Sequence, residues 1–446
     1  MPTSACEIAC LVPHPTRAAL LTRADGSLPL TAIEGEYRLR DLLDAVESLL
    51  GVLPPVLRVD QRRSDAAGEP TLVVVDLESP GATPPDGFTW TSWRGTGVGA
   101  RSPKEARDAL PRWIERRERG PTPLDPPWAI PGWSARAAAW MEDRLRDAGH
   151  PATSPPRLVY SWGISVILCA PTAAGKHYLK CSAPIFAAEA VLTSALAGIT
   201  PELVTRVVAA EKAEGWLLMA DHGDRVLGEQ PARTWAGGLD ALATIQRAWR
   251  GRTAELVAAG APVRSVAALG DLLPGLADSE PLRSELGADL EVWNAAMPRF
   301  VAACGRLAEL GPAPTLVHGD FHPWNVAVTD DRPLVFDWSD TAISHPFVDL
   351  AVYLTRTDDV AVRRDLRDAY LARWRDGIPA GELAEAAEVA LLVGTLYQVE
   401  CYARLLGSLE PEDRGGMNGA AGSWARAALD VLEHGIATQR PGHADG

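Results

Sequence analysis

One segment constrains the fold and the chemistry of this chain more than any other: TLVHGDFHPWNVAVTDDRPLVFDWSD, residues 315–340. Its apolar runs and turn residues predict a strand, a polar loop, a second strand, a tight turn and a third strand. The polar loop HGDFHPWN crowds two histidines, an acid, a tryptophan and an asparagine behind the first apolar run. Because polar groups are costly to bury without partners, this crowding at the end of a strand indicates a functional site.

The patterns around this hairpin predict a bilobal α+β fold. From 157 to 227 strand signals dominate, with one helical run, IFAAEAVLTSALA, and beyond 231 the chain is mostly helical. A small β-rich lobe followed by a large helical lobe favours a cleft between them, where ligands commonly bind. The predicted divisions are an N-terminal α/β domain (1–95), a linker (96–133), a small lobe with a preceding helix (134–227) and a helical large lobe carrying the hairpin (228–437).

The first 95 residues alternate strand-like and helix-like patterns. RLRDLLDAVESLLG has apolar residues spaced three and four apart, and Gly51 ends this run as a helix C-cap would. PTLVVVDLES then has the apolar composition of a buried strand. The stretch that follows is rich in Gly, Pro and Arg, with little periodicity apart from PKEARDALPRWIERRE, and it ends in GPTPLDPPWAIPGW, which predicts the linker.

Composition and charge exclude several classes of protein. With 47% hydrophobic and 23% charged residues, the chain is expected to be soluble and globular. No basic and apolar leader opens the sequence, and no apolar run has the length of a membrane span, so we expect no membrane partner. The net charge of −15 argues against a nucleic acid partner, whose phosphates require a basic face. The six cysteines are scattered without a C-x-x-C pair, which predicts reduced thiols and a cytoplasmic location.

Three polar side chains of the hairpin have the spacing of a phosphoryl-transfer site. Asp320 and Asn325 share the polar loop, and Asp337 follows the apolar run PLVF. Phosphoryl transfer from a nucleotide requires a carboxylate that receives the proton of the acceptor hydroxyl, and oxygen ligands for Mg²⁺. Asp320 suits the first role, and Asn325 and Asp337 suit the second. We therefore predict ATP and Mg²⁺ as cofactors.

The arrangement H-G-D-x-x-x-x-N, followed by an apolar strand and D-W, resembles the aminoglycoside phosphotransferase and choline kinase group of protein-kinase-like enzymes. The resemblance extends to ISHPFVDLA (343–351), since the group usually has P-x-x-D-L-A after its second metal aspartate. It covers roughly 155 to 435 and implies a protein-kinase-like fold with ATP in the cleft. The implied roles are a catalytic base (Asp320), two Mg²⁺ ligands (Asn325, Asp337) and support of the catalytic loop (His318, Asp349).

Two positions depart from the pattern of this group. Trp324 stands where the family mostly has glycine before the asparagine, and Ser339 stands where glycine or glutamate is usual in the D-F-G-like triplet. Neither change removes a predicted metal ligand.

A kinase-like small lobe also needs a lysine on a central strand, paired with a glutamate on the next helix. The chain has only four lysines, and HYLKC sets Lys180 in a predicted strand with Glu189 on the helix that follows. Lys176 is the alternative, but it adjoins a glycine turn where exposure is expected. GWLLMADHGD has the position of the hinge between lobes, so we expect main-chain groups from Met219 to Asp221 to bind adenine.

The acceptor site is expected near the catalytic loop and on the C-terminal helices. Acids and aromatic rings there suit an amino sugar or another amine-bearing polyol, through charge and stacking. Each side chain also has a structural alternative, as a core or surface residue. The candidates are His322, Trp324, Trp338, Asp340, Gln398, Glu400 and Tyr402.

The N-terminal segment has a second resemblance, to the Nudix module, whose signature helix ends R-E-U-x-E-E-x-G-U. Aligned on Gly51, the chain has Asp44, Ala45, Ser48 and Leu49 where that family has Arg and three Glu, and only Glu36 matches an earlier acid. Without those glutamates we expect no hydrolysis, and a docking, lid or assembly role for a protein partner that the sequence does not identify. An unrelated α/β domain with an amphipathic helix is the alternative.

Together these features predict an ATP- and Mg²⁺-dependent O-phosphotransferase acting on a small hydroxylated molecule such as an amino sugar or aminoglycoside. The alternative is a nucleotide-binding, pseudokinase-like regulator that acts through its N-terminal domain. Phosphorylation of proteins is less favoured, because SDTAISHP is too short for a peptide-docking activation loop.

Overall fold

The structure is a computed structural model that describes residues 5–35, 37–63, 70–95 and 97–435. The chain folds into two compact units. The first comprises 1–173 together with 409–415, and the second comprises 174–408 and 416–446. The division between them along the chain falls in the turn after β8 (Ser165–Thr172) and before β9 (Gly175–Ser182).

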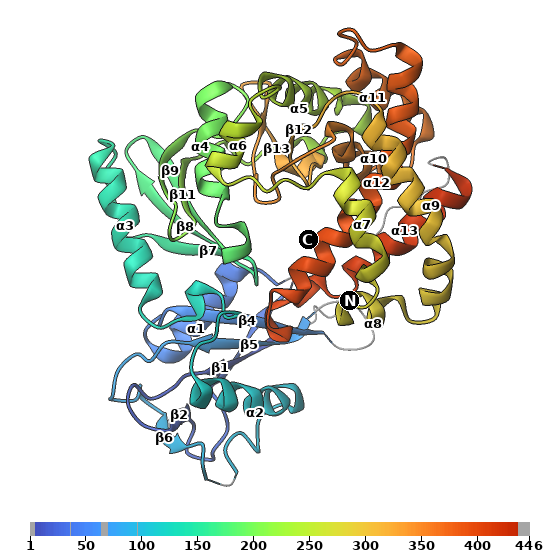
Figure 1. Cartoon of the computed structure of the whole chain (residues 1–446). Coiled ribbons are helices and arrows are strands. Elements are labelled where there is room, and N and C mark those ends of the chain that lie inside the picture. Colours follow the sequence, from blue (N-terminus) through green and yellow to red (C-terminus); the bar gives the residue numbers. More distant parts are fainter. Residues whose placement is uncertain (1–4, 36, 64–69, 96, 436–446) are drawn as a thin grey trace. The chain divides into compact units, whose positions relative to one another are not determined.

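The first unit is built around a mixed four-stranded sheet of order β3-β1-β5-β4, in which β1 runs parallel to β5 and the outer pairs are antiparallel. Side chains alternate along β1, so Ile8 and Cys10 face one layer of the core while Ala9 and Leu11 face the other. Helix α1 covers the first face and α2 the second (Figure 1). The bounds are β1 Ala5–Leu11, β2 Ala19–Thr22, β3 Leu30–Glu34, α1 Leu39–Leu50, β4 Val56–Arg63, β5 Pro70–Leu77, β6 Thr89–Ser92 and α2 Lys104–Arg119.

The predicted end of the first helix is confirmed. Gly51 has a left-handed φ of 70°, and its N–H donates to the carbonyl of Glu47. This is the conformation that favours glycine at a helix C-terminus. Glu36, the acid that matches the Nudix signature, lies outside the described residues.

The middle of the segment 96–133, which the sequence predicts to be a linker, folds into α2. Its apolar face packs Ala106, Leu110 and Trp113 onto the sheet. The indole Nε1 of Trp113 donates to Asp76 Oδ1 at 2.9 Å. The helix is stable because its buried stripe covers a sheet face that would otherwise be exposed. The predicted domain boundaries themselves stay predictions.

The first unit continues with a 3-10 turn η1 (Pro127–Ala129), helix α3 (Trp133–Asp147) and the antiparallel hairpin of β7 (Arg157–Ser161) and β8. Residues 409–415, which follow α12 in the chain, also belong to this unit. Asp413 is anchored there by Arg58, whose Nε donates to Asp413 Oδ1 at 2.9 Å.

The β-rich part of the second unit carries the predicted lysine and glutamate. Strand β11 (Trp216–Ala220) pairs antiparallel with both β10 (Val207–Glu211) and β9. Lys180 lies opposite Leu217 in the β9–β11 pair, and helix α4 (Glu189–Ile199) follows β9. The predicted helix and strands are therefore confirmed here.

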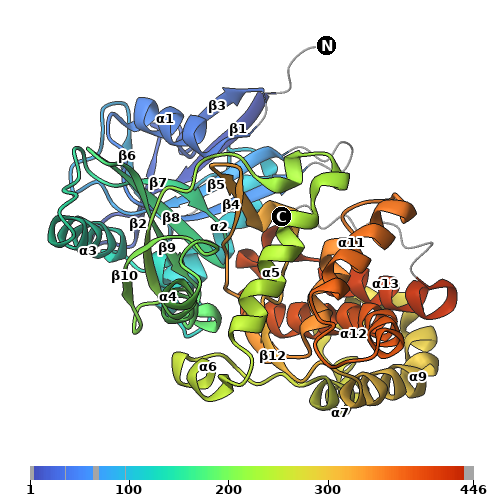
Figure 2. The same ribbon diagram turned by 90° about the horizontal axis from the view of Figure 1, so that it is seen from above.

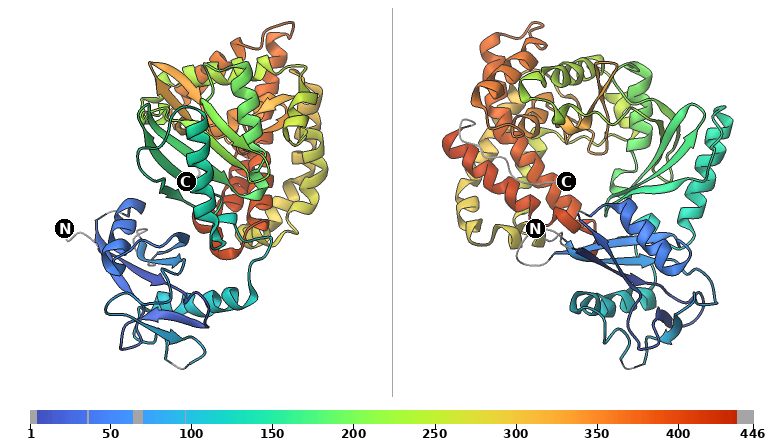
Figure 3. Two further views of the ribbon diagram at one scale, coloured as in Figure 1. Left: turned by 90° about the vertical axis from the view of Figure 1, so that its left-hand side faces the viewer. Right: turned by 180° about the vertical axis from the view of Figure 1, so that it is seen from behind.

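The remainder of the second unit is helical, apart from the predicted hairpin, so its mixed α/β content agrees with the predicted fold class. Helix α12 contacts α9, α10 and α13 (Figure 2), and α12 and α13 lie side by side in both views of Figure 3. The bounds are α5 Ala236–Ala248, α6 Thr253–Ala259, α7 Val266–Leu276, α8 Glu280–Leu286, α9 Leu290–Glu309, α10 Asp349–Leu354, α11 Val360–Ala372, α12 Ala380–Gly407 and α13 Ala420–His434.

By length and composition alone, α12 could cross a membrane. However, 72% of its most apolar window is buried in the structure, as in the core helix of a soluble protein. Cys10, Cys181, Cys304 and Cys401 are buried free thiols.

The hairpin has the predicted order of strands. Strand β12 (Thr315–Val317) pairs with β15 (Ala342–Ser344), and β13 (Val326–Thr329) pairs with β14 (Arg332–Val335). Asp330 and Asp331 form the tight turn with φ of 49° and 58°. Positive φ at both central residues is typical of the type I′ turn that matches strand twist.

Candidate active site

A lysine and two carboxylates lie at the centre of the site. Lys180 Nζ donates to Glu189 Oε1 at 2.8 Å and to Asp337 Oδ1 at 2.6 Å. Glu189 is the first residue of α4, and its Oε2 accepts a hydrogen bond from Ser182 Oγ at 2.6 Å. The structure thus brings together three residues that the sequence singles out, two of them 157 positions apart.

Burial and charge act in opposite directions on this lysine. The side chains of Lys180 and Glu189 are 9% and 2% exposed, whereas that of Asp337 is 39% exposed. Burial disfavours the ammonium form, but the two carboxylates outweigh it and raise the pKa of Lys180 above its usual value. Lys180 is therefore a fixed cation at neutral pH.

Asp337 combines an unusual backbone with an ionised side chain. Its φ is 63°, a left-handed conformation that costs a non-glycine residue about 1–3 kcal/mol. Although burial favours the neutral acid, Lys180 and a 2.8 Å hydrogen bond from Ser339 Oγ hold the pKa of Asp337 below its ordinary value. A partly exposed carboxylate held in this way suits a metal ligand.

The loop before Asp320 is fixed by close backbone contacts. Gly319 has a φ of 89°, and a Cβ at this position would lie 2.3 Å from the carbonyl oxygen of Asp340. Asp349 Oδ2 accepts from the N–H of His318 and its Oδ1 accepts from the N–H of Gly319, each at 2.9 Å. These contacts define the backbone from which the Asp320 side chain projects.

A buried chain of hydrogen bonds supports Asp349 from behind. Gln246 Nε2 donates to Asp349 Oδ2 at 2.9 Å, and Gln246 Oε1 accepts from the hydroxyl of Tyr370 at 2.5 Å. Gln246 and Tyr370 are both fully buried. Because satisfied polar networks in the core fix one arrangement, this hydrogen-bonded network holds the loop of His318 and Gly319 in place.

His318 holds the two halves of the hairpin together. Its Nε2 lies 3.1 Å from the carbonyl oxygen of Phe336, which can only accept, so the proton is on Nε2. Burial lowers the pKa of His318 to about 4, so the ring is neutral at physiological pH. The ring also packs against Trp338 at a centroid distance of 4.6 Å.

Asp320 is an ionised carboxylate that reaches solvent. Its side chain is 36% exposed, and its Oδ2 lies 3.6 Å from His322 Nε2. Burial opposes ionisation, but His322, Arg356 and His318 outweigh it and hold the pKa of Asp320 well below its usual range. The Nε of Arg356 is buried without a hydrogen-bond partner in the described part of the chain.

Asn325 faces the catalytic loop from η6 (Pro323–Asn325). Its Nδ2 donates to the carbonyl oxygen of Asp320 at 3.0 Å, a bond that does not engage its Oδ1. Among the described residues no group of three or more His, Cys, Asp or Glu side chains could hold a metal ion. A metal held by Asn325 and Asp337 would therefore need further ligands, which nucleotide phosphates and water supply for Mg²⁺.

The predicted acceptor residues fall into two groups in the structure. Trp324 is 43% exposed. Its indole packs against Gly228 so closely that a Cβ at Gly228 would lie 2.3 Å from Trp324 Cδ2. Trp338, in contrast, is fully buried, and its Nε1 donates to the carbonyl of Val335. Gln398 is 3% exposed, and its Nε2 donates to the Gly319 carbonyl at 2.5 Å. Burial favours a supporting role for Trp338 and Gln398 over contact with the acceptor.

Arginines surround the remaining acidic candidates. Glu400 pairs with Arg264 and lies 3.5 Å from Arg404. Burial and the negative charge of Asp320 raise the pKa of Asp340 to about 7, although Arg264 and Arg404 oppose this rise. The charge on Asp340 therefore changes near neutral pH.

The predicted hinge lies between neighbouring strands, and part of its backbone is already hydrogen-bonded. Met219 is 8% exposed and lies between Val207 and Tyr178 of the neighbouring strands. The N–H of Asp221 donates to the carbonyl of Lys176 at 3.1 Å. That amide is already engaged, and the adenine contact stays a prediction.

Sequence reasoning missed several residues that shape the site. Gln246 lies in α5 and Arg356 in the turn after α10, and neither belongs to a local motif. Their partners in the site are distant in the sequence. The pairing of Arg264 with Glu400 spans 136 residues. The scarcity of lysines drew attention to Lys180, but no comparable signal marks individual arginines.

Comparison with known proteins identifies the class of enzyme. Residues 184–388 match the model of a family described as "Phosphotransferase enzyme family". This range includes Glu189, the catalytic loop and Asp349. The chain is a small-molecule kinase or phosphotransferase, and the predicted enzyme class is confirmed.

Several solved structures are similar to the chain. A choline/ethanolamine kinase family protein from Mesorhizobium loti has 16% identity and a TM-score of 0.49, covering 69% of this chain and 97% of that one. Macrolide 2'-phosphotransferase MphH from Brachybacterium faecium has 20% identity and a TM-score of 0.44, covering 66% and 98%. The GDP and kanamycin complex of APH(2")-IIia has 15% identity and a TM-score of 0.46, covering 67% and 98%.

These identities and TM-scores are low, so we base the function on the family match and on side-chain geometry. No curated protein sequence matches the chain significantly. The Nudix-like resemblance of the N-terminal segment is not confirmed.

Proposed function

We propose that the chain is an ATP- and Mg²⁺-dependent O-phosphotransferase that acts on a small, amine-bearing polyol such as an amino sugar or aminoglycoside. The observation that carries this proposal is the ion cluster of Lys180, Glu189 and Asp337, with contact distances of 2.8 and 2.6 Å. Phosphoryl transfer depends mainly on positioned charges, and this cluster supplies them.

Asp320 is the base in this proposal. Its low pKa keeps the carboxylate ionised at neutral pH. It accepts the proton of the acceptor hydroxyl as that oxygen attacks phosphorus. Such a weak base receives the proton late, after the bond from the acceptor oxygen to phosphorus has begun to form and has made the hydroxyl proton more acidic. Late proton transfer suits a loose transition state.

Asn325 and Asp337 hold Mg²⁺ in this proposal. Asn325 uses its Nδ2 on the Asp320 carbonyl, which leaves the amide oxygen as a ligand, and Asp337 offers an ionised oxygen at a partly exposed position. Both are the hard oxygen donors that Mg²⁺ prefers. When bound, ATP with Mg²⁺ supplies an activated phosphoryl group whose charge the metal neutralises.

Lys180 and the hinge bind the nucleotide in this proposal. Glu189 keeps the Lys180 ammonium at a fixed point of β9, where it can donate to phosphate oxygens. Main-chain groups from Met219 to Asp221 bind the adenine edge, other than the amides of Ala220 and Asp221, which already donate to the carbonyls of Arg206 and Lys176.

The acceptor contacts we propose are His322, Trp324, Asp340, Glu400 and Tyr402. Asp340 is the main determinant of acceptor binding in this proposal. Its pKa is about 7, and an adjacent ammonium group of the acceptor favours its ionised form. Glu400 contributes less, since Arg264 and Arg404 already neutralise it. The exposed Trp324 ring can stack on a sugar face.

For the N-terminal sheet and its helices, we propose a separate α/β module with a positioning or docking role. The degenerate Nudix-like signature around Asp44 and Ser48 supports the absence of hydrolytic chemistry there. A cytoplasmic enzyme without nucleic acid or membrane partners fits the net charge of −15 and the reduced cysteines.

A mass-spectrometric screen tests this function. The full chain is incubated with ATP and Mg²⁺ and with aminoglycosides, amino sugars, neutral sugars and amino alcohols, and each acceptor is examined for one added phosphate. We expect phosphorylation of at least one amine-bearing polyol. A thermal shift with ATP and Mg²⁺ but no phosphorylated acceptor would instead support a nucleotide-binding regulator of the pseudokinase type.

A further inference from the structure

Residues 409–415, which we call the anchored segment, connect two helices of the second unit but fold with the first unit. They follow α12, which ends at Gly407, and precede α13, which begins at Ala420. Helices α12 and α13 pack against each other. The connection between two packed helices of the second unit is therefore held by residues of the first.

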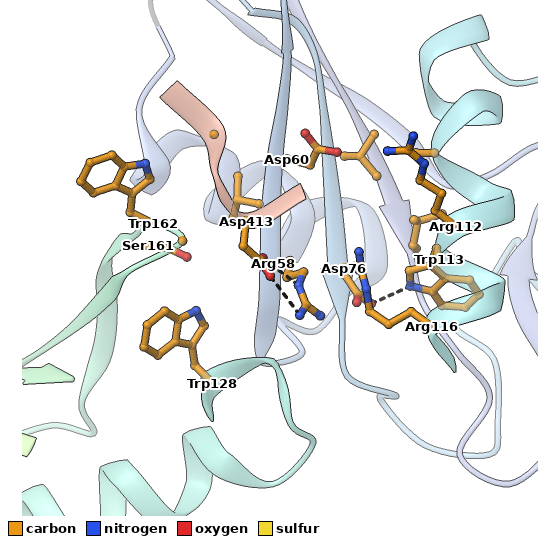
Figure 4. Close-up of a pocket in the computed structure, with 16 residues that line it drawn as sticks. Arg58, Asp60, Asp76, Arg112, Trp113, Arg116, Trp128, Ser161, Trp162 and Asp413 are labelled. Atoms are coloured by element: carbon orange, nitrogen blue, oxygen red, sulfur yellow. Dashed lines mark hydrogen bonds and ion pairs between the residues drawn. The ribbon is translucent and has the colours of Figure 1, made fainter. Parts of the chain in front are cut away.

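A buried ion cluster holds the anchored segment. Arg58 of β4 donates from Nε to Asp413 Oδ1 at 2.9 Å and from Nη2 to Asp413 Oδ2 at 3.3 Å (Figure 4). Its Nη2 also donates to Asp125 Oδ1 at 2.5 Å. The side chains of Arg58, Asp413 and Asp125 are 9%, 5% and 3% exposed. Because a buried charge without its partner is strongly destabilising, this cluster fixes Asp413 within the first unit.

Close packing and a second ion pair hold the same segment. Gly163, in the turn between β7 and β8, lies so close to it that a Cβ there would be 1.6 Å from the carbonyl oxygen of Asp413. Glu410 accepts from Arg119 Nη2 at 3.2 Å. With Glu410 and Asp413 both held, the 3-10 turn η8 (Pro411–Asp413) has a defined position in the first unit.

The connection from α12 to the anchored segment is short. Only Ser408 and Leu409 lie between Gly407 and Glu410. The N–H and the hydroxyl of Ser408 both donate to the carbonyl of Leu405, at 3.0 and 2.7 Å, so the last turn of α12 is capped. Because each residue spans at most about 3.6 Å, the position of Glu410 limits the position of the end of α12.

The far side of the anchored segment leads to a fixed point as well. Glu285 of α8 accepts from the N–H of Gly419 at 2.7 Å and from the N–H of Gly422 at 2.8 Å, at the start of α13. Both ends of the segment are therefore attached to ordered helices of the second unit.

The C-terminal part of α12 carries residues of the phosphotransferase site. Gln398 Nε2 donates to the carbonyl of Gly319, the residue before Asp320, at 2.5 Å. Burial and the nearby charges of Asp320 and Asp340 raise the pKa of Tyr402, so its hydroxyl is neutral at physiological pH. A shift of this part of α12 would move Tyr402 and the support of the catalytic loop together.

We propose that Arg58 is a positioning residue for the acceptor site, on which it acts through Asp413 and α12. The inference rests on the proposed phosphotransfer and gives the first unit a positioning role rather than a docking role. Lys180 bonds to Glu189 and Asp337, and neither bond involves α12. The effect is therefore expected on the acceptor and not on ATP.

Two variants of the full chain release the anchored segment. Gly163→Ala displaces it, because Gly163 lacks a left-handed φ that would disfavour alanine and its Cβ would meet the backbone of Asp413. Asp413→Ala removes the ion pair, while Arg58 keeps Asp125 as a partner. We expect each variant to raise KM for the acceptor by about tenfold or more, with an unchanged KM for ATP.

The matched control is Gly416→Ala, the same substitution directly after the anchored segment. Gly416 also lacks a left-handed φ, and no atom lies within 4 Å of its Cβ position. This control should have the kinetics of the unaltered chain. If Gly163→Ala or Asp413→Ala does not fold, Glu410→Ala takes its place, because it removes only a partly exposed ion pair.

Hydrogen–deuterium exchange followed by mass spectrometry measures the same coupling without an acceptor. We expect the amides of residues 398–407 to exchange at least about tenfold faster in the two variants, while α4 and the Gly416→Ala control keep the rates of the unaltered chain. Faster exchange in α4 as well would show general destabilisation and would overturn the proposal.

Two further results would overturn it. One is unchanged exchange of residues 398–407 in every variant that releases the segment. The other is an equal rise of KM for the acceptor and for ATP. If the unaltered chain phosphorylates no acceptor, the phosphotransferase proposal fails, and the exchange rates alone decide whether the first unit positions α12.

Discussion

Replacement of Lys180 by methionine should destabilise the second unit strongly as well as stop phosphotransfer. Methionine retains much of the volume but removes the ammonium group that Glu189 and Asp337 share. Glu189 is 2% exposed and would keep only the Ser182 hydroxyl as a partner. The contact with Asp337 contributes less, because that carboxylate is 39% exposed and solvent screens it.

Loss of one partner from a buried ion pair costs about 3–5 kcal/mol, because a charge remains buried without compensation. Burial already raises the pKa of Glu189, and Lys180 opposes that rise. Without Lys180 the folded-state pKa rises further above the unfolded value of about 4.3. The penalty is therefore smallest near pH 4 and grows as the pH rises towards the new folded-state pKa.

Equilibrium urea unfolding at several pH values measures this effect. We expect Lys180→Met/Glu189→Gln to recover most of the lost free energy at pH 7, because both charges are then absent. Lys176→Met, at an exposed position near the start of the same strand, should change stability by no more than about 0.5 kcal/mol. A Lys180→Met variant with unchanged stability, or with a loss that does not depend on pH, would refute the reasoning.

Three further predictions concern the catalytic loop. Gln246→Leu should lower the unfolding free energy by about 1–3 kcal/mol and reduce kcat, because Tyr370 and Asp349 lose their buried partner; unchanged kcat would exclude a positioning role. Gly319→Ala should cost about 1–3 kcal/mol or more from its φ of 89° and its contact with Asp340, as unfolding measures, and should abolish activity. Because the pKa of Asp340 is about 7, KM for an amine-bearing acceptor should fall between pH 6 and 8 as the carboxyl ionises, and Asp340→Asn should remove this pH dependence.

The hairpin could be predicted because its signals are local. Strands β12 to β15 and the functional side chains between them lie within thirty consecutive residues, where apolar runs and turn residues alternate. The pair of Lys180 and Glu189 could also be predicted, since they lie only nine residues apart on a strand and the next α-helix.

The residues that support the hairpin from behind could not be predicted, because their contacts join distant parts of the chain. Gln246 and Asp349 are 103 residues apart, and nothing in the pattern of α5 distinguishes this glutamine from a surface residue. The burial of Trp338 follows from its packing against His318, which depends on the folded hairpin. Tertiary contacts of this kind leave no periodic signal.

Helix α2 shows how composition can conceal an element. Its sequence contains Pro111 and many charged residues, so the stretch has the composition of a linker. Its buried residues Ala106, Ala109, Leu110 and Trp113 have the spacing of three and four that is typical of an amphipathic helix, but they are few among many charged residues.

The turnover of Asp320→Asn, compared with that of the unaltered chain under saturating ATP, Mg²⁺ and acceptor, tests the central claim most directly. Asparagine has nearly the same shape as aspartate but cannot take up the proton of the acceptor hydroxyl. We predict that kcat falls by several orders of magnitude while calorimetry shows unaltered nucleotide binding. A variant that retains a near-normal kcat would contradict the account.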